Sequence, residues 1–452
     1  NYYLKGDIIG KQGVEMSYEK HLRGVKGIEF IQKDRFNRDI GKYKNGSLDI
    51  PSIPGKDLTI TIDSKLQEYG ELLMKNKRGA IVALEPKSGE ILALVSSPSY
   101  NPNLLVGRER SKNYVELYKD SIYKPLIDKG LLSMFPPGSP FKILAGLTAL
   151  QEKSITERST IYCKGYYVYG KEKRRMNCHC GGGYRNIYNA ISLSCNSYFA
   201  DIYRKTIDSD NNTKKSFNQW SNHIKSFGLG NYLNNDLPVG KKGVIPNSEY
   251  YDRWYPDFKW GATTTLSNAI GQGEILTTPI QLANMTAAVA NKGYYLTSHI
   301  IKNIDGDSID IRFRTPIKTT IDSIHFETMD KALFKVYKSG TGKLLQIPGI
   351  EVSGKSGTAE NFVKINKVKT QLSDHSIFVA YAPRENPKIA ISVLVENAGY
   401  GSVWAGRIAS LMIEKYLKKE ISLKKIERLV INKNLKAEYL KPYLGKPFKI
   451  NE

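Results

Sequence analysis

Residues 135–151 have the sequence FPPGSPFKILAGLTALQ, in which a turn, a serine and a long apolar run follow one another. The Pro-Pro-Gly run predicts a turn, and the apolar residues beyond it predict a buried helix that begins at Ser139. Lys142 follows one helical turn later, so both side chains share a face of that helix. The N–H groups at a helix start stabilise developing negative charge. Ser139 is therefore a candidate nucleophile, and Lys142 is its candidate base.

Three other segments have the same spacing of serine and lysine, and they begin at Ser17, Ser121 and Ser422. Ser17 and Ser422 lie in polar, lysine-rich stretches. Ser121 precedes Pro125 too closely to open a stable helix. An isolated serine at a helix start is most often only a cap, so the choice of Ser139 depends on the rest of the chain.

Two further short motifs follow, and each has a competing copy. SCN at 194–196 lies in an apolar helical stretch, where burying polar side chains costs free energy unless they have hydrogen-bond partners. SDN at 209–211 lies in a polar run typical of a solvated loop. KSGT at 355–358 lies in a strand signal and precedes two clear strands. KSGT at 338–341 instead ends an amphipathic helix and resembles a C-cap. The motifs S-x-x-K, S-x-N and K-[ST]-G together are typical of β-lactamases and penicillin-binding proteins.

The periodicity elsewhere predicts an antiparallel sheet and helices packed on it. Strands are expected at 57–63, 79–84, 90–96, 349–359, 376–382 and 389–396. Helices are expected at 64–75, from 139 onward, and at 186–204, 279–290 and 407–417. Irregular structure is expected at 1–50, 97–138 and 161–185, and a solvated helix is expected beyond 418. This order of elements indicates an α+β fold or an α/β/α sandwich around an antiparallel sheet.

Composition limits the class of protein. The chain has 452 residues, of which 40% are hydrophobic and 25% charged, and this fits two or three folded domains. It contains 67 Lys and Arg against 44 Asp and Glu, for a formal net charge of +23. The lysines are scattered and basic–aromatic nucleic-acid motifs are absent, so no nucleic-acid partner is expected. No apolar run reaches the roughly 18 residues of a membrane span.

All 4 cysteines lie in one short segment, at Cys163, Cys178, Cys180 and Cys195. Thiolates clustered in a glycine-rich segment predict a structural zinc site, in which His179 can replace one cysteine. Two disulfides and free buried thiols are the alternatives. The spacing differs from that of standard zinc fingers, so the residues alone leave the three interpretations open.

With their neighbours, the three motifs resemble the signatures of class B penicillin-binding proteins. The matching stretches are FPPGSPFK at 135–142, SCNSYF at 194–199 and GKSGTAE at 354–360, and they occur in the order of the family. AIGQGE at 269–274, followed by TPIQLA, is similar to the elongation-type members, the penicillin-binding protein 2 group. GKQGVE at 10–15 resembles the end of their non-catalytic pedestal domain.

The resemblance implies a penicillin-binding or serine β-lactamase-like transpeptidase fold, with a five-stranded antiparallel sheet between helices and an all-helical part. It divides the chain into a remnant of the pedestal domain with a linker at 1–50, a transpeptidase domain at 51–417 and a basic tail at 418–452. It also implies that the rest of the pedestal and a single N-terminal inner-membrane anchor lie outside this chain. The catalytic domain is then periplasmic.

The implied activity is peptidoglycan D,D-transpeptidation during cell elongation, through a serine acyl-enzyme that β-lactams also form. By resemblance, Ser139 is the nucleophile, Lys142 the base and Ser194 the group that passes a proton to the leaving amine. Asn196 then binds the donor backbone, and Lys355 supplies positive charge. The remaining substrate-binding residues implied by the third motif are Ser356, Gly357 and Thr358.

The family chemistry requires no cofactor. Some elongation-type relatives hold a metal at the middle residue of the S-x-N motif, here Cys195, and this favours zinc over disulfides. The implied partners are stem peptides, β-lactams, the membrane glycosyltransferase of the elongation complex and its periplasmic shape-determining scaffold protein. A serine β-lactamase, which is shorter and needs an added base, and a catalytically weak β-lactam sensor or scaffold are the alternative functions.

Overall fold

The computed structural model describes residues 2–4, 6–365 and 368–443. Its centre is a five-stranded antiparallel sheet in the order β13-β16-β17-β4-β5. These strands are β4 (Gly79–Leu84), β5 (Ile91–Ser97), β13 (Ser353–Ala359), β16 (His375–Ala382) and β17 (Ile389–Val395). The α+β fold class with a five-stranded antiparallel sheet between helices is thus confirmed. β13, which carries the KSGT motif, is an edge strand.

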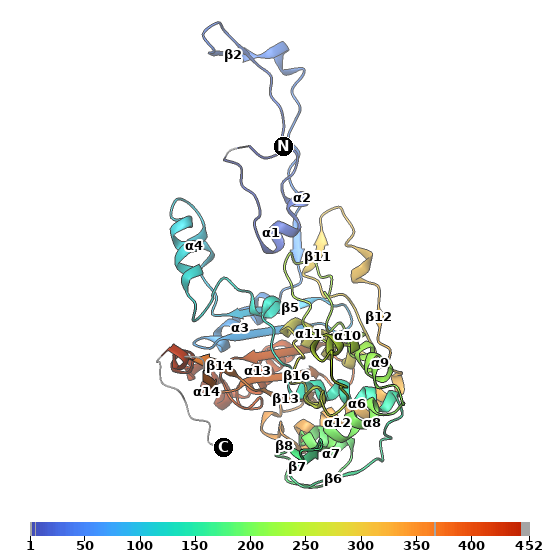
Figure 1. The fold of residues 1–452 in the computed structure, drawn as a ribbon. Coiled ribbons are helices and arrows are strands. Elements are labelled where there is room, and N and C mark those ends of the chain that lie inside the picture. The colour runs from blue at the N-terminus through green and yellow to red at the C-terminus, as the bar shows by residue number, and fades with distance from the viewer. Residues whose placement is uncertain (1, 5, 366–367, 444–452) are drawn as a thin grey trace.

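Helices cover both faces of this sheet (Figure 1). The α-helices of the described residues are α1 (Gly13–Ser17), α2 (Glu19–Leu22), α3 (Ser64–Met74), α4 (Arg110–Lys119), α5 (Lys129–Leu132), α6 (Lys142–Gln151), α7 (Ile187–Ser192), α8 (Asn196–Ile207), α9 (Thr213–Lys225), α10 (Ser248–Trp254), α11 (Pro279–Ala290), α12 (Ser323–Ser339), α13 (Ala405–Lys418), α14 (Lys424–Asn432) and α15 (Lys436–Leu440). One apolar core joins the sheet to α3 and α13, and the other joins it to α11 and the α6–α8 region. Strands β4, β16 and β17 are buried along their whole length for this reason.

Shorter strands pair two by two outside the main sheet. The pairs are β1 (Ile31–Lys33) with β2 (Asp39–Lys42), β3 (Leu58–Ile60) with β11 (Ile301–Ile304), β6 (Ile161–Cys163) with β9 (Gly183–Arg185), β7 (Tyr166–Tyr169) with β8 (Arg174–Asn177), β10 (Tyr294–Tyr295) with β12 (Ile317–Lys318), and β14 (Phe362–Ile365) with β15 (Val368–Gln371). The expectation of irregular structure at 161–185 is therefore wrong, because four of these strands fold that segment around its cysteines. Residues 97–138 likewise contain α4 and α5.

The helix expected at 186–204 is interrupted. It ends at Ser192 and resumes at Asn196, and Ser194 has a positive φ of 55°. Apolar side chains continue through the break, so periodicity alone does not reveal it. The break is important because it lies within the second motif.

The segment beyond 418 is also more than a solvated helix. Val430, Leu435 and Tyr439 are buried in the core formed with α3 and α13. The Tyr439 hydroxyl accepts a hydrogen bond from the backbone N–H of Arg78 (2.7 Å), immediately before β4. The described part of this tail is thus packed on the domain, and residues 444–452 lie outside the described residues.

The N-terminal segment projects from the domain (Figure 1) and contains α1, α2 and the β1–β2 hairpin, so the expectation of an irregular lead-in is wrong.

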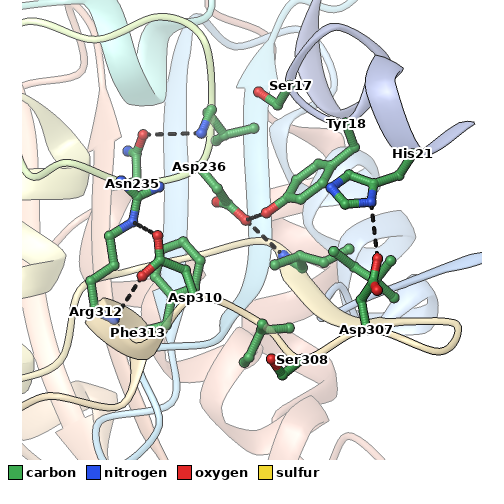
Figure 2. Close-up of a pocket in the computed structure, with 14 residues that line it drawn as sticks. Ser17, Tyr18, His21, Asn235, Asp236, Asp307, Ser308, Asp310, Arg312 and Phe313 are labelled. Carbon is green, nitrogen blue, oxygen red and sulfur yellow. Dashed lines mark hydrogen bonds and ion pairs between the residues drawn. The ribbon is translucent and has the colours of Figure 1, made fainter.

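The junction of the N-terminal segment with the domain lines a cavity of about 700 Å³. There the Tyr18 hydroxyl donates to the buried carboxylate of Asp236 (2.8 Å), and His21 lies 3.3 Å from Asp307 (Figure 2). The backbone N–H groups of Ile300 and Ile301 also bind Asp236. Within the described residues, no helix has the length and apolar character needed to span a membrane.

Candidate active site

Ser139 follows a tight turn that presses it against the edge strand β13. Gly138 has φ 60° and ψ −144°, and its N–H donates to the carbonyl of Gly271 (2.9 Å). A Cβ atom built on Gly138 would lie 2.7 Å from the carbonyl oxygen of Thr358, so only glycine fits. A short 3-10 turn from Ser139 to Phe141 then leads into α6.

Lys142 is the first residue of α6, and its side chain is 0% exposed. Its Nζ donates to the Ser194 carbonyl (2.9 Å), to Ser194 Oγ (3.2 Å) and to Asn196 Oδ1 (2.6 Å). Burial lowers the pKa of Lys142 to about 8, because removal from water disfavours the charged ammonium. About one lysine in ten is therefore neutral at pH 7, and a general base must be in this neutral form.

Ser194 links the first two motifs. Its Oγ donates to Ser139 Oγ (2.9 Å) and accepts from Lys142 Nζ. The positive φ of Ser194 turns its hydroxyl and its carbonyl toward the start of α6, which a continuous helix would not allow. Asn196 opens α8, and its amide also donates to the carbonyl of Asn177 (2.9 Å).

The third motif lies on β13. Lys355 is 0% exposed, and its Nζ donates to the carbonyl of Ser356 (2.9 Å). The pKa of Lys355 lies well below the ordinary value of 10.5, mainly because the side chain is buried and also because the charge of Lys142 is nearby. A Cβ built on Gly357 would lie 2.3 Å from Pro140 Cδ, so this strand lies directly against the turn that bears Ser139. Thr358 Oγ1 accepts a hydrogen bond from Gly401 N–H (3.4 Å).

Ser139, Lys142, Ser194 and Asn196 thus form one hydrogen-bonded cluster, with the KSGT strand beside it. The competing motif copies lie elsewhere or have other contacts. Ser17 lines the N-terminal junction, Ser422 bonds to Glu414, and residues 209–211 follow the end of α8. A buried lysine bonded to a serine hydroxyl that itself contacts a second serine can move a proton off that second serine, which is the requirement for nucleophilic attack.

The four cysteine sulfurs all lie within 4.8 Å of one another, and all four side chains are buried free thiols. Cys178 and Cys195 are 3.6 Å apart, as are Cys163 and Cys180. Four sulfurs bound tetrahedrally to zinc at about 2.3 Å lie about 3.8 Å apart, so this donor set fits zinc. His179 is exposed and lies outside the group.

Comparisons with known proteins agree with this geometry. The family model described as the penicillin binding protein transpeptidase domain matches residues 79–414. This chain is a member of the penicillin-binding protein transpeptidase family. The model of the penicillin-binding protein dimerisation domain matches residues 1–60 of this penicillin-binding protein.

Several relatives of this penicillin-binding protein belong to the group expected from the motifs. It is 33% identical to the peptidoglycan D,D-transpeptidase MrdA of Acinetobacter baumannii, over 92% of this chain and 61% of the relative. It is 33% identical to MrdA of Haemophilus influenzae, over 93% of this chain and 64% of the relative. The chain therefore spans less than two thirds of the length of these relatives.

Solved structures give the same family. Pseudomonas aeruginosa PBP2 in complex with WCK 5153 has 33% identity and a TM-score of 0.73, with 90% of this chain and 84% of that chain covered. The complex between PBP2 and MreC from Helicobacter pylori has 27% identity and a TM-score of 0.75, with 91% of this chain and 73% of that chain covered. The resemblance to class B and penicillin-binding protein 2 sequences is thus confirmed.

Sequence reasoning missed two residues beside the site of this penicillin-binding protein. Gln272 Nε2 donates to the carbonyl of Thr358 (3.2 Å). Thr341 Oγ1 lies 2.8 Å from Ser356 Oγ. Thr341 belongs to the KSGT copy at 338–341, which was correctly predicted to end a helix. No local sequence signal indicates that this copy lies beside β13.

Proposed function

We propose that this penicillin-binding protein is a peptidoglycan D,D-transpeptidase of the elongation type. In this proposal it cross-links stem peptides through an acyl-enzyme on Ser139 and is inhibited by β-lactams. The observation that carries the proposal is the contact chain from Ser139 Oγ to Ser194 Oγ (2.9 Å) and on to the buried Nζ of Lys142 (3.2 Å). The identity to MrdA transpeptidases of other bacteria supports it.

Acylation begins when neutral Lys142 accepts the Ser194 hydroxyl proton while Ser194 Oγ takes the proton of Ser139, so both hydrogen bonds reverse their direction. Ser139 Oγ bonds to the carbonyl carbon of the penultimate D-Ala, and the bond from that carbon to the terminal D-Ala nitrogen breaks. Ser194 passes the proton to this leaving amine, and Lys142 is neutral again. The backbone N–H groups of Ser139 and Thr358 stabilise the oxyanion. An amine of a second stem peptide then bonds to the ester carbon, the bond from that carbon to Ser139 Oγ breaks, and the proton lost by the amine returns to Ser139 Oγ.

The donor peptide lies along the free edge of β13, because an edge strand offers unpaired backbone groups to an extended chain. Its terminal carboxylate binds the hydroxyls of Ser356 and Thr358 next to Gly357, and this nearby negative charge favours the positively charged form of Lys355. Asn196 uses Oδ1 for Lys142, one amide hydrogen for Asn177, and its second amide hydrogen for the donor backbone.

We propose that Cys163, Cys178, Cys180 and Cys195 hold a structural zinc ion, which has no part in the chemistry. The backbone N–H of Asn196 donates to Cys178 Sγ (3.1 Å), and Cys163 Sγ lies 3.2 Å from Ser197 Oγ. The cysteine cluster thus lies directly behind the turn that carries Ser194 and Asn196. A bound ion would stabilise that turn, because metal binding to the folded state adds to the free energy of folding.

The remaining proposals concern the whole protein. Residues 1–50 are the end of the pedestal domain with a linker, 51–417 the transpeptidase domain and 418–452 a basic tail. The enzyme is periplasmic and held in the inner membrane by an anchor outside this chain. Its partners are the membrane glycosyltransferase of elongation and a periplasmic scaffold protein, supported by the similar structure of Helicobacter pylori PBP2 with MreC.

Intact-mass measurement after incubation with benzylpenicillin tests the function. We expect one stable adduct, and peptide mapping should assign it to Ser139. Ser139→Ala should give no adduct, whereas the matched variants Ser17→Ala and Ser422→Ala should react like wild type. Rapid turnover of penicillin would indicate a β-lactamase instead. Failure to release D-Ala from a stem peptide in the presence of an acceptor amine would favour a sensor.

A further inference from the structure

Thr341 connects two parts of the site that are far apart in the sequence. Its backbone N–H donates to the carbonyl of Ser192, at the end of α7 and two residues before Ser194 (3.1 Å). Its Oγ1 lies within hydrogen-bond distance of Ser356 Oγ on β13 (2.8 Å). One residue therefore contacts both the segment that carries the S-x-N motif and the strand that carries KSGT.

The position of Thr341 is tightly defined on both sides. A Cβ built on Gly340 would lie 2.3 Å from the carbonyl oxygen of Ser192, so a larger residue would push the two segments apart. The N–H groups of Gly340 and Gly342 both donate to the carbonyl of Val336, in the last turn of α12 (3.1 and 3.0 Å). The end of α12 thus holds the Thr341 backbone rigidly against α7.

The hydroxyl of Ser356 has one hydrogen and two lone pairs. When this hydrogen binds the donor carboxylate, the contact with Thr341 survives only if Thr341 Oγ1 donates and Ser356 Oγ accepts. Thr341 carries no negative charge and keeps its own hydrogen for this purpose. The Ser356 hydrogen then points away from Thr341. The hydrogen bond that Ser356 Oγ accepts from Thr341 polarises the Ser356 O–H bond and strengthens its donation to the carboxylate.

We propose that Thr341 is a positioning residue for carboxylate recognition. It orients the Ser356 hydroxyl so that the enzyme favours donors and β-lactams with a free carboxylate. This inference rests on the proposed function, in which Ser356 binds that carboxylate. It gives the second KSGT copy a role different from that of the first.

The test uses benzylpenicillin and its methyl ester, which differ only at the carboxylate. Stopped-flow acylation of the full chain separates the dissociation constant of the first complex from the maximal acylation rate. Thr341→Val keeps the shape and removes the donor, and we expect it to weaken binding of the acid about fivefold, typical of one hydrogen bond. The maximal rate and the ester kinetics should stay within twofold of wild type. Thr341→Ser should restore binding, and Ser339→Ala, in the same turn, is the matched control.

Equal losses for acid and ester, or no loss for either, would overturn the role of Thr341. If thermal melting shows that Thr341→Val is unfolded, three other variants are measured in its place. These are Thr341→Ala, Ser356→Ala and the double variant that carries both substitutions. In the Ser356→Ala background the second substitution should have no further effect on the acid, and an additive loss would contradict the inference. A wild-type chain that forms no adduct would overturn the proposed function itself, whereas a reactive wild type with an unaffected Thr341→Val overturns only this step.

Discussion

Replacement of Lys142 by methionine should nearly abolish acylation of Ser139. The Lys142 ammonium has 0% exposure and contacts three oxygens, two of Ser194 and one of Asn196. Methionine has a similar shape and fills the same space without a basic atom. Loss of a general base typically lowers the rate about 10²- to 10⁴-fold, or by ~3–5 kcal/mol in activation free energy.

The pH dependence gives an independent measure of the same residue. Burial lowers the pKa of Lys142 to about 8, and in the proposed mechanism the neutral form of Lys142 is the active base. At pH 7 about one molecule in ten then has neutral Lys142, and at pH 9 about nine in ten do. The acylation rate of wild type should therefore rise about tenfold between these pH values and level off above pH 9.

Rapid-mixing measurements with a fluorescent penicillin between pH 6.5 and 9.5 check both expectations. Lys338→Met is the matched control, because Lys338 is the exposed lysine of the other KSGT copy and should leave the rate unchanged. A wild-type rate that does not vary with pH would refute the reasoning. So would a Lys142→Met rate within threefold of wild type.

Four further outcomes follow from the structure. Elemental analysis of protein purified without chelator should find about one zinc per chain, and chelation should lower the melting temperature; metal-free protein with an unchanged melting temperature would contradict the zinc site. Tyr18→Phe should lower the unfolding free energy by about 1–3 kcal/mol in denaturant titration, because Asp236 stays buried with one donor fewer; an unchanged midpoint would show that this contact is neutral. Gly357→Ala should slow acylation about 100-fold at nearly constant circular dichroism, since its Cβ meets Pro140 and displaces β13 from Ser139. Burial lowers the pKa of Lys129 to about 8, so the unfolded chain binds more protons between pH 8 and 10 and stability rises with pH in that window; Lys129→Met should reduce this rise, and an identical slope would speak against it.

Much of the architecture is local in origin and could be predicted. Ser139 and Lys142 are one helical turn apart, so their shared face follows from helix geometry alone. The helix at Pro279–Ala290 has a Thr278 capping box and a proline at its first position, and these are signals within four residues of the helix start. The largely apolar sequences of β16 and β17 likewise predict strands buried on both faces.

Other features depend on contacts that no local pattern contains. The sequence around Tyr439 resembles a solvated basic tail. Tyr439 is nevertheless buried, because its ring packs in the core around α3 and its hydroxyl binds the backbone N–H of Arg78. The two KSGT copies have identical residues, and only their packing makes one a strand of the main sheet and the other the end of α12.

The break at Ser194 shows the physical reason most clearly. The apolar periodicity around it favours an unbroken helix, and a positive φ at a serine is unfavourable in isolation. The conformation is stable because Lys142, 52 residues away, bonds to the Ser194 carbonyl, and because Ser139, 55 residues away, receives its hydroxyl. Side-chain spacing over three or four residues determined which groups are available for chemistry. Hydrogen bonds across more than fifty residues, which form only in the complete fold, decided how those groups are aimed at one another.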